Sequence, residues 1–124
     1  MKLIALDTNF LLYAAKYKID IVSELDRICD FSYNMVLPEQ VLKELMEIST
    51  SGKGKDREAA LLALQLANNF EIRKIDEKSA DDALLKLASR NVLATMDKEL
   101  RKRFKKGKSA RVIAIRQKKY LIFT

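Results

Sequence analysis

Short apolar runs alternate with amphipathic segments along the whole chain, and this alternation constrains the fold more than any other feature of the sequence. Strands are expected at Lys2–Leu6, Met35–Leu37, Phe70–Ile75 and Asn91–Thr95, and several of them are short and apolar throughout, such as Met35–Leu37. Runs this short that are apolar throughout are typical of strands buried on both faces, as in a parallel sheet covered by helices. The sequence therefore predicts an α/β fold, with a three-layer α/β/α arrangement around a mostly parallel central sheet.

Residues with helical spacing fill the intervals between these runs. Helices are expected over residues 10–14, 21–29, 39–49, 57–68, 79–89 and after residue 97, and two last strands over 111–115 and 120–123. Pro38 suits the first turn of the helix that follows it. The stretch STSGKGKD at 49–56 holds two of the chain's three glycines and no apolar residue, which predicts a mobile loop.

Length and composition limit the class of protein. A chain of 124 residues that is 48% hydrophobic suits a single domain covering residues 1–124. It has no signal-peptide pattern and no apolar run of about 18 residues, so we expect a cytoplasmic protein without a membrane partner. It has no histidine and only one cysteine, Cys29, which excludes an internal disulfide, Cys/His zinc sites and histidine bases. Catalysis would then fall to carboxylates, Lys or Tyr, aided by a metal ion.

Positive charge is concentrated near the end of the chain. The net charge is +7, and eight of the 24 Lys and Arg residues lie between Lys98 and Arg111, where Glu99 is the one acid. A cluster of this kind predicts contact with nucleic-acid phosphates, with a solubilising helix face as the alternative. The residues assigned to RNA contact are Lys98, Arg101, Lys102, Arg103, Lys105, Lys106 and Lys108.

Two aspartates come at the ends of apolar runs. Asp7 directly follows the first run, and Asp97 comes shortly after Val92–Ala94. Parallel sheets form their sites at the carboxyl ends of the strands, so both positions are candidates for a site. For either aspartate alone, a helix N-cap is the competing interpretation.

Glu44 occupies an unusual place for a charged residue. Val41, Glu44, Leu45 and Ile48 follow the i, i+3, i+4, i+7 rule and share one helix face, so Glu44 is predicted to point inward. Glu47 lies off that face and is interpreted as an ordinary solvent-facing charge. A buried carboxylate needs a cation or a shared proton to offset its desolvation.

The pair Asp81-Asp82 opens another predicted helix. Asp81 precedes Leu84, Leu85 and Ala88 by three, four and seven positions, so it extends their buried stripe to the helix tip. Asp82 is turned away from that stripe. Capping is the alternative for both, because acids are favoured in a first turn by the helix dipole.

Carboxylates that converge in one place would repel each other, by about 4 kcal/mol per pair at a separation of about 4 Å and an effective dielectric near 20. A divalent cation removes this conflict, and Mg²⁺ and Mn²⁺ accept ligation by oxygen alone. Such ions activate water for attack on phosphorus. Together with the basic segment, the acids predict a metal-dependent nuclease.

Four segments resemble, in order, the acidic motifs of the PIN domain family, whose members are small nucleases of RNA: LIALDTNFLL, LPEQVLKELMEI, ADDALLKLA and VLATMDKELRKR. The likeness covers nearly the whole chain. The run ATMDKELRKR and the terminal segment RVIAIRQKKYLIF look most like the Fcf1/Utp24 branch and its archaeal counterparts, which process ribosomal RNA.

The resemblance implies a parallel sheet flanked by helices, with a negatively charged pocket that holds Mg²⁺ or Mn²⁺. The family's catalytic and metal-binding acids correspond to Asp7, Glu44, Asp81 and Asp97, with Asp82 as the alternative third acid. The polar residues that orient its ligands correspond to Thr8, Asn9 and Thr95.

These observations favour a divalent-metal-dependent endoribonuclease, with ribosomal RNA processing as its setting and a ribosome-assembly factor as its partner. The alternatives are a toxin-type ribonuclease with an antitoxin partner and a catalytically weak RNA-binding or scaffold domain. Apolar positions on the first two helices suit a homodimer face and equally suit the core. Phosphoryl transfer through an aspartyl phosphate is disfavoured, because Asp7-Thr8-Asn9 lacks the second aspartate of haloacid-dehalogenase-type phosphatases.

Overall fold

Within the residues that the structure describes, six strands form one sheet at the centre of the molecule. In the computed structural model, which describes residues 1–106 and 110–124, the strand order is β3-β2-β1-β4-β5-β6. The strands are β1 Lys2–Leu6, β2 Tyr33–Pro38, β3 Glu71–Arg73, β4 Val92–Ala94, β5 Arg111–Arg116 and β6 Tyr120–Phe123. Neighbouring strands are parallel except for the antiparallel pair β5 and β6. The predicted mostly parallel sheet is confirmed.

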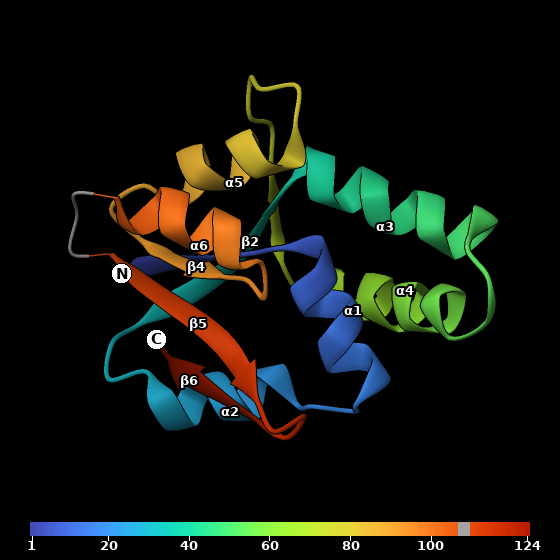
Figure 1. Cartoon of the computed structure of the whole chain (residues 1–124), viewed down its shortest axis with the longest axis horizontal. Coiled ribbons are helices and arrows are strands. Elements are labelled where there is room, and N and C mark those ends of the chain that lie inside the picture. The colour runs from blue at the N-terminus through green and yellow to red at the C-terminus, as the bar shows by residue number, and fades with distance from the viewer. Residues whose placement is uncertain (107–109) are drawn as a thin grey trace.

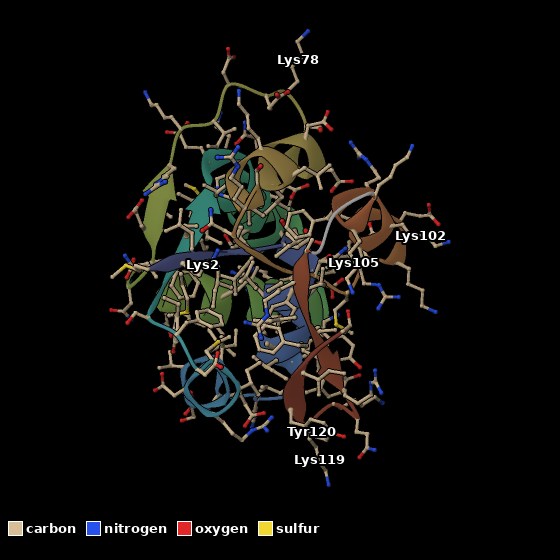
Figure 2. The ribbon with its side chains drawn as sticks, turned by 90° about the vertical axis from the view of Figure 1, so that its left-hand side faces the viewer. Lys2, Lys78, Lys102, Lys105, Lys119 and Tyr120 are labelled. Carbon is tan, nitrogen blue, oxygen red and sulfur yellow. The ribbon has the colours of Figure 1, made fainter. Side chains whose placement is uncertain are left out.

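Helices cover both faces of this sheet. They are α1 Thr8–Lys16, α2 Ile21–Ile28, α3 Glu39–Ser51, α4 Gly54–Ala67, α5 Ala80–Ala88 and α6 Lys98–Lys105. Helix α5 packs on β1, β2 and β4 from one face, while α1 and α4 pack together on the other (Figures 1 and 2). The α/β/α layering predicted from the sequence is therefore confirmed. Within the described residues, every helix is too short or too polar to span a lipid bilayer.

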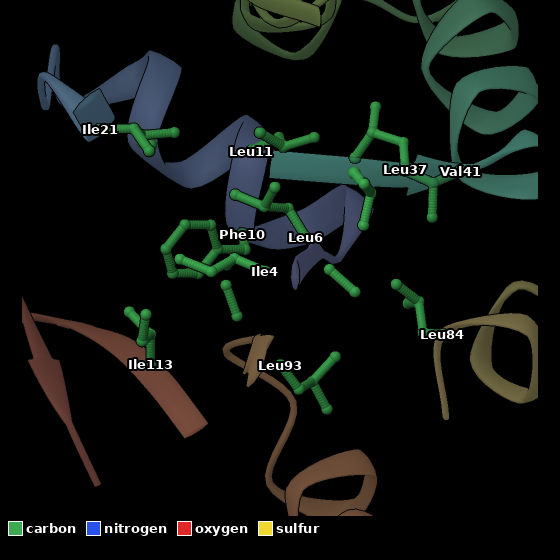
Figure 3. Close-up of a cluster of buried hydrophobic side chains, with 14 of the residues drawn as sticks. Ile4, Leu6, Phe10, Leu11, Ile21, Leu37, Val41, Leu84, Leu93 and Ile113 are labelled. Carbon is green, nitrogen blue, oxygen red and sulfur yellow. The ribbon is translucent and has the colours of Figure 1, made fainter. Parts of the chain in front are cut away.

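The central strand β1 is buried on both faces, which explains why its sequence is continuously apolar. Ile4 and Leu6 have no exposed surface, and they pack with Phe10 of α1, Leu93 of β4 and Ile113 of β5 (Figure 3). Fully burying each such side chain contributes about 1.5–3 kcal/mol. The end of β1 is therefore a rigid position from which to present a side chain.

The prediction of a mobile loop over residues 49–56 is wrong. Helix α3 continues to Ser51 and α4 begins at Gly54, so Gly52 and Lys53 alone separate them. The hydroxyls of Ser49 and Ser51 donate to carbonyl oxygens one turn earlier, so these polar residues find their partners within the helix. A Cβ at Gly52 would collide with the preceding turn of α3, which explains the glycine at this helix end.

Pro38 lies one position before its predicted place. It is the last residue of β2, paired in register with Arg73, and the N-cap of α3. Because its backbone is extended, it joins the strand to the helix without a loop.

Candidate active site

The carboxyl end of β1 is the point where the connections of the sheet reverse direction. Strand β2 lies on one side of β1 and β4 on the other, which creates a crevice between the diverging connections. The N-terminal ends of α1, α3, α5 and α6 gather around this crevice (Figure 1). A pocket of about 250 Å³ is found there, lined by Asp7, Thr8, Asn9, Glu44, Glu47, Ile48, Asp81 and Asp97. The structure thus brings the acids predicted at four separate places in the sequence to one pocket.

Asp7 is the most buried of these acids, with 6% of its surface exposed. It occupies the N-cap position of α1, yet its carboxylate makes no capping hydrogen bond to that helix, all of which the structure describes. Instead its Oδ2 accepts a hydrogen bond of 2.9 Å from Thr95 Oγ1. The register of β1 with β4 aligns Leu6 with Ala94, so the two residues that follow these strands lie side by side.

Burial raises the pKa of Asp7 to about 6, because desolvation penalises its charged form. The hydrogen bond from the Thr95 side chain and the nearby backbone amide of Thr8 oppose this rise, while the negative charges of Asp81 and Glu44 add to it. The capping interpretation is therefore wrong for the Asp7 side chain. Its carboxylate faces the pocket, and burying its charge there costs free energy.

Thr95 links two of the pocket's acids. Its hydroxyl donates to Asp7 and accepts a hydrogen bond of 3.0 Å from the backbone amide of Asp97. The Asp97 Oδ1 in turn accepts bonds of 2.9 and 3.1 Å from the amides of Glu99 and Leu100, so Asp97 is the N-cap of α6. The Asp97 side chain therefore has both roles: it caps α6 and it lines the pocket.

Glu44 lines the pocket but is exposed, which corrects its predicted burial. The buried residues of α3 are Val41, Leu45 and Ser49, each one turn apart, so the true stripe passes beside Glu44. The carboxylate accepts a hydrogen bond from the Thr8 hydroxyl, which holds it toward the start of α1.

Glu47 also lines the pocket, and the sequence reasoning missed it. Its position three residues after Glu44 was the available signal, because residues at i and i+3 are neighbours on a helix surface. Glu47 is exposed, so it adds negative charge at the rim of the pocket.

Asp81 and Asp82 have different surroundings. Asp81 is half-buried and lines the pocket. Asp82 is exposed, lies outside the set of described residues that line the pocket, and pairs with Arg103 of α6 at 2.7 Å. That hydrogen bond, together with one from Ser79, lowers the pKa of Asp82. The geometry favours Asp81 as the third acid of the pocket.

The donor set fits a hard divalent cation in its chemistry. The pocket offers oxygen ligands alone, and a bound cation would offset both the desolvation and the smaller carboxylate repulsion that raise the pKa of Asp7. Over residues 1–106 and 110–124, no three His, Cys, Asp or Glu side chains form a group already arranged to hold an ion. The carboxylates line a common wall without meeting at one point.

Two of the predicted RNA-contacting cations lie next to the acids. Lys98 and Arg101 line a hollow of about 170 Å³ that shares Asp97 with the acidic pocket. They come from the first turns of α6, whose N-cap is Asp97. Positive charge is therefore adjacent to the pocket.

The other cations of α6 have different neighbours. Arg103 pairs with Asp82, Lys102 Nζ lies 3.8 Å from Glu99, and Lys105 donates to the carbonyl of Thr124. Figure 2 shows Lys102 on the outer side of α6 and Lys105 on the side toward β5. Lys106 is exposed. The prediction for Lys108 lies outside the described residues.

Comparison with known proteins agrees with this geometry. The sequence matches the family model described as "PIN like domain" over residues 4–118. It is 34% identical over 119 residues to "Ribonuclease VapC4" of Methanocaldococcus jannaschii, covering 92% of this chain and 90% of the relative. It is 36% identical over 101 residues to "Ribonuclease VapC9" of Archaeoglobus fulgidus, covering 80% and 73%.

Solved structures share the fold at lower identity. The PIN domain endonuclease Utp24 has a TM-score of 0.78 and 22% identity, over 98% of this chain and 90% of that chain. VapBC2 from Rickettsia felis, bound to a DNA fragment from its promoter, has a TM-score of 0.59 and 17% identity, over 81% and 92%. These likenesses are evidence of architecture alone.

Proposed function

Because the chain belongs to the PIN-like domain family, as its motifs predicted, we propose that it is a metal-dependent endoribonuclease that hydrolyses RNA phosphodiester bonds. Its similarity to two proteins named as ribonucleases supports this activity. The observation that carries the proposal is the pocket in which Asp7, Glu44, Asp81 and Asp97 share one wall at the carboxyl end of β1. This is where parallel sheets place their catalytic groups.

In this proposal the same four acids hold Mg²⁺ or Mn²⁺. The ion, when bound, supplies activation of water and neutralisation of phosphate charge. Thr95 and Thr8 keep the carboxylates of Asp7 and Glu44 in place through the hydrogen bonds that they donate. Asn9, exposed at the pocket wall, is available to orient the substrate or bound water. Lys98 and Arg101 hold the phosphate backbone beside the acids.

A toxin-type ribonuclease with an antitoxin partner is the second candidate, and the two relatives named VapC favour it. Ribosomal RNA processing with an assembly partner stays a prediction, because the Utp24 likeness is one of fold. Homodimer formation also stays a prediction. Its candidate face consists of exposed Leu, Ile and Tyr positions of the first two helices, and Tyr17, directly after α1, is 41% exposed.

Cleavage of labelled RNA with Mn²⁺ tests the activity. We expect wild type to cleave the RNA. The cleavage rate of Asp7→Asn should be lower by about 100-fold or more, since loss of even an outer-shell metal partner lowers affinity or activity roughly 10–100-fold. Asp82→Asn is the matched control, because it neutralises a neighbouring acid that lies outside the pocket wall. Wild type that folds but cleaves no RNA with either Mn²⁺ or Mg²⁺ would support the scaffold alternative.

A further inference from the structure

A second cavity lies at the opposite edge of the sheet from the acidic pocket. It has a volume of about 590 Å³, and its wall includes Lys2, Phe31, Arg90, Val92, Phe104 and Arg111. Lys2 and Arg111 are the first residues of β1 and β5, and the amino ends of these strands lie on the left of Figure 1. Asp7 follows the last residue of β1, so the length of this strand, roughly 16 Å, separates the cavity from the acids.

The cavity is cationic. Lys2, Arg90 and Arg111 are basic, and no aspartate or glutamate is among the described residues of its wall. Over residues 1–106 and 110–124, none of the three cations lies within ion-pair distance of a carboxylate. Because the protein does not neutralise this charge, the cavity attracts anions. Arg111 is the last residue of the basic segment found in the sequence, and it lies away from the acidic pocket.

Two phenylalanines restrain the guanidinium of Arg111. Its Cζ lies 4.0 Å from the ring centroid of Phe123 and 5.1 Å from that of Phe31. A guanidinium held over aromatic rings keeps its N–H groups in its own plane, where they match the spacing of two phosphate oxygens. A freely solvated arginine has no such restraint, so less conformational entropy is lost when Arg111 binds an anion.

Arg90 occupies a backbone conformation that glycine prefers. The amide of Asn91 donates to the carbonyl of Ala88 at 2.7 Å, which closes a turn. Ser89 has φ −54° and ψ 125°, and Arg90 has φ 65°, as in a type II turn, whose third residue is usually glycine. The carbonyl of Arg90 accepts a hydrogen bond of 3.0 Å from Lys2 Nζ, so the turn also holds Lys2 in place. A strained arginine at the cavity wall is explained if its charge binds a ligand.

The rest of the wall is largely apolar, since Phe31, Val92 and Phe104 lie beside the cations. We propose that this cavity binds a nucleotide, with its phosphate on the three cations and its base against the phenylalanines. Inorganic phosphate would use the charges alone, whereas a nucleotide uses both parts of the wall. The volume of about 590 Å³ is within the range of small-molecule sites. The chemistry is the same for a free nucleotide and for the terminal nucleotide of an RNA strand.

Calorimetric titration in EDTA tests the proposal, since chelation prevents metal-mediated binding of phosphate at the acidic pocket. The ligands are the four 5′-nucleoside monophosphates, the matching nucleosides, inorganic phosphate and a short RNA with a 5′-phosphate. At least one monophosphate should bind more tightly than its nucleoside and than inorganic phosphate. Arg111→Gln should weaken that binding by roughly 10- to 100-fold, the effect of losing a charge-assisted hydrogen bond.

Arg57→Gln is the matched control. Arg57 is exposed on α4, which lies on the right of Figure 1, so the variant should bind the nucleotide as wild type does. Arg90→Gly covers the case in which Arg111→Gln does not fold. Glycine favours the positive φ of this position, so this variant should unfold at a temperature no lower than wild type. It should still lose about 10-fold or more in nucleotide affinity.

Nuclear magnetic resonance locates the bound nucleotide. The amide signals of Lys2, Asn91 and Arg111 should shift during the titration, while those of Asp7 and Asp97 should not. A phosphorylated RNA that binds more tightly than the mononucleotide would assign the cavity to the end of a strand, and weaker or equal binding would assign it to a free nucleotide.

Three results would overturn the proposal: no nucleotide binding at millimolar concentration, binding that Arg111→Gln and Arg90→Gly leave unchanged, or inorganic phosphate that binds as tightly as every nucleotide. Signal shifts confined to the acidic pocket would overturn it as well. These measurements involve neither metal nor cleavage, so their outcome is independent of the proposed ribonuclease activity.

Discussion

The hydroxyl of Thr95 donates a hydrogen bond of 2.9 Å to the carboxylate of Asp7, which lies 88 positions earlier in the chain. Both residues are buried, with 2% and 6% of their surfaces exposed. Because the same hydroxyl also accepts the amide of Asp97, one side chain ties the end of β1 to the start of α6. This hydrogen bond is the main support for a charged Asp7 in the absence of metal.

Replacing Thr95 by valine should raise the pKa of Asp7 further, because the hydrogen bond that it removes favours the charged carboxylate. The free energy of unfolding at pH 8 in chelator should fall by about 1–3 kcal/mol, the cost of leaving buried polar groups unpaired. Urea unfolding measures this loss. Thr95→Ser keeps the hydroxyl and should retain most of the stability, so equal losses in the two variants would contradict the assigned role.

Asp7→Asn should stabilise the metal-free protein at high pH. The Asp7 pKa is about 6 in the folded state against an ordinary value of 3.8, so the folded protein holds this proton more tightly. Stability is therefore lost as pH rises from about 4 to about 6, and the full penalty, about 3 kcal/mol, is present above that range. The free energy of unfolding of the variant should exceed that of wild type by up to this amount at pH 8 in chelator. Near pH 4 the two values should be equal.

Urea unfolding at several pH values measures this difference. A variant whose advantage is the same at pH 4 and pH 8 would show that the carboxyl charge is not its source. Added Mn²⁺ should reverse the order at pH 8, because wild type alone keeps the full set of ligands.

Asp81→Asn and Asp82→Asn should separate the two adjacent acids. The first removes a carboxylate from the pocket wall and should lower both kcat/KM and Mn²⁺ affinity. The second breaks an exposed pair with Arg103, and exposed pairs contribute little to stability. Steady-state cleavage and calorimetric Mn²⁺ titration distinguish the two variants. If Asp82→Asn, and not Asp81→Asn, lowered kcat/KM and Mn²⁺ affinity, Asp82 would be the metal ligand.

Lys98→Gln with Arg101→Gln should weaken RNA binding more than Lys102→Gln with Lys106→Gln, since the first pair lies beside Asp97. Removing each side chain that binds a phosphate should reduce the slope of log affinity against log salt by about one. Fluorescence anisotropy at several salt concentrations measures this slope. Equal slopes for the two double variants would indicate a diffuse charge effect in place of defined phosphate-binding positions.

The turn between β5 and β6 is conformationally strained. Gln117 and Lys118 have φ angles of 55° and 56°, as in a type I′ turn, where Asn-Gly is preferred. Replacing the pair by Asn-Gly should raise the free energy of unfolding by about 0.5–1 kcal/mol. Lys119→Gly is the control. This neighbouring residue has no positive φ, so glycine brings no relief there and should lower the free energy of unfolding.

The sequence predicted the pocket because two rules hold for it independently. Apolar runs located the strands, and parallel strands bring their carboxyl ends to one edge, so Asp7 and Asp97 were expected at the same edge of the sheet. Helical periodicity also placed Asp81 on the buried side of α5, where it is half-buried. These features depend on local spacing, which a single sequence contains.

The sequence-based predictions were wrong or incomplete where a residue's surroundings depend on how helices pack against each other. Periodicity alone does not distinguish a stripe through Glu44 from the stripe at Val41, Leu45 and Ser49, and the position of α4 against α3 decides between them. The pair of Asp82 with Arg103 likewise depends on how α5 meets α6. The polar stretch 49–56 has no apolar marker because its helical residues are largely exposed.

The pairing of β1 with β4 has a consequence for the timing of activity during synthesis. Leu6 meets Ala94 in the sheet, so Asp7 has no Thr95 beside it until β4 has left the ribosome. A nascent chain that ends before β4 carries the first acids without the last. We expect a nuclease built on this pocket to stay inactive during synthesis at least until β4 has paired with β1 and Thr95 has reached Asp7.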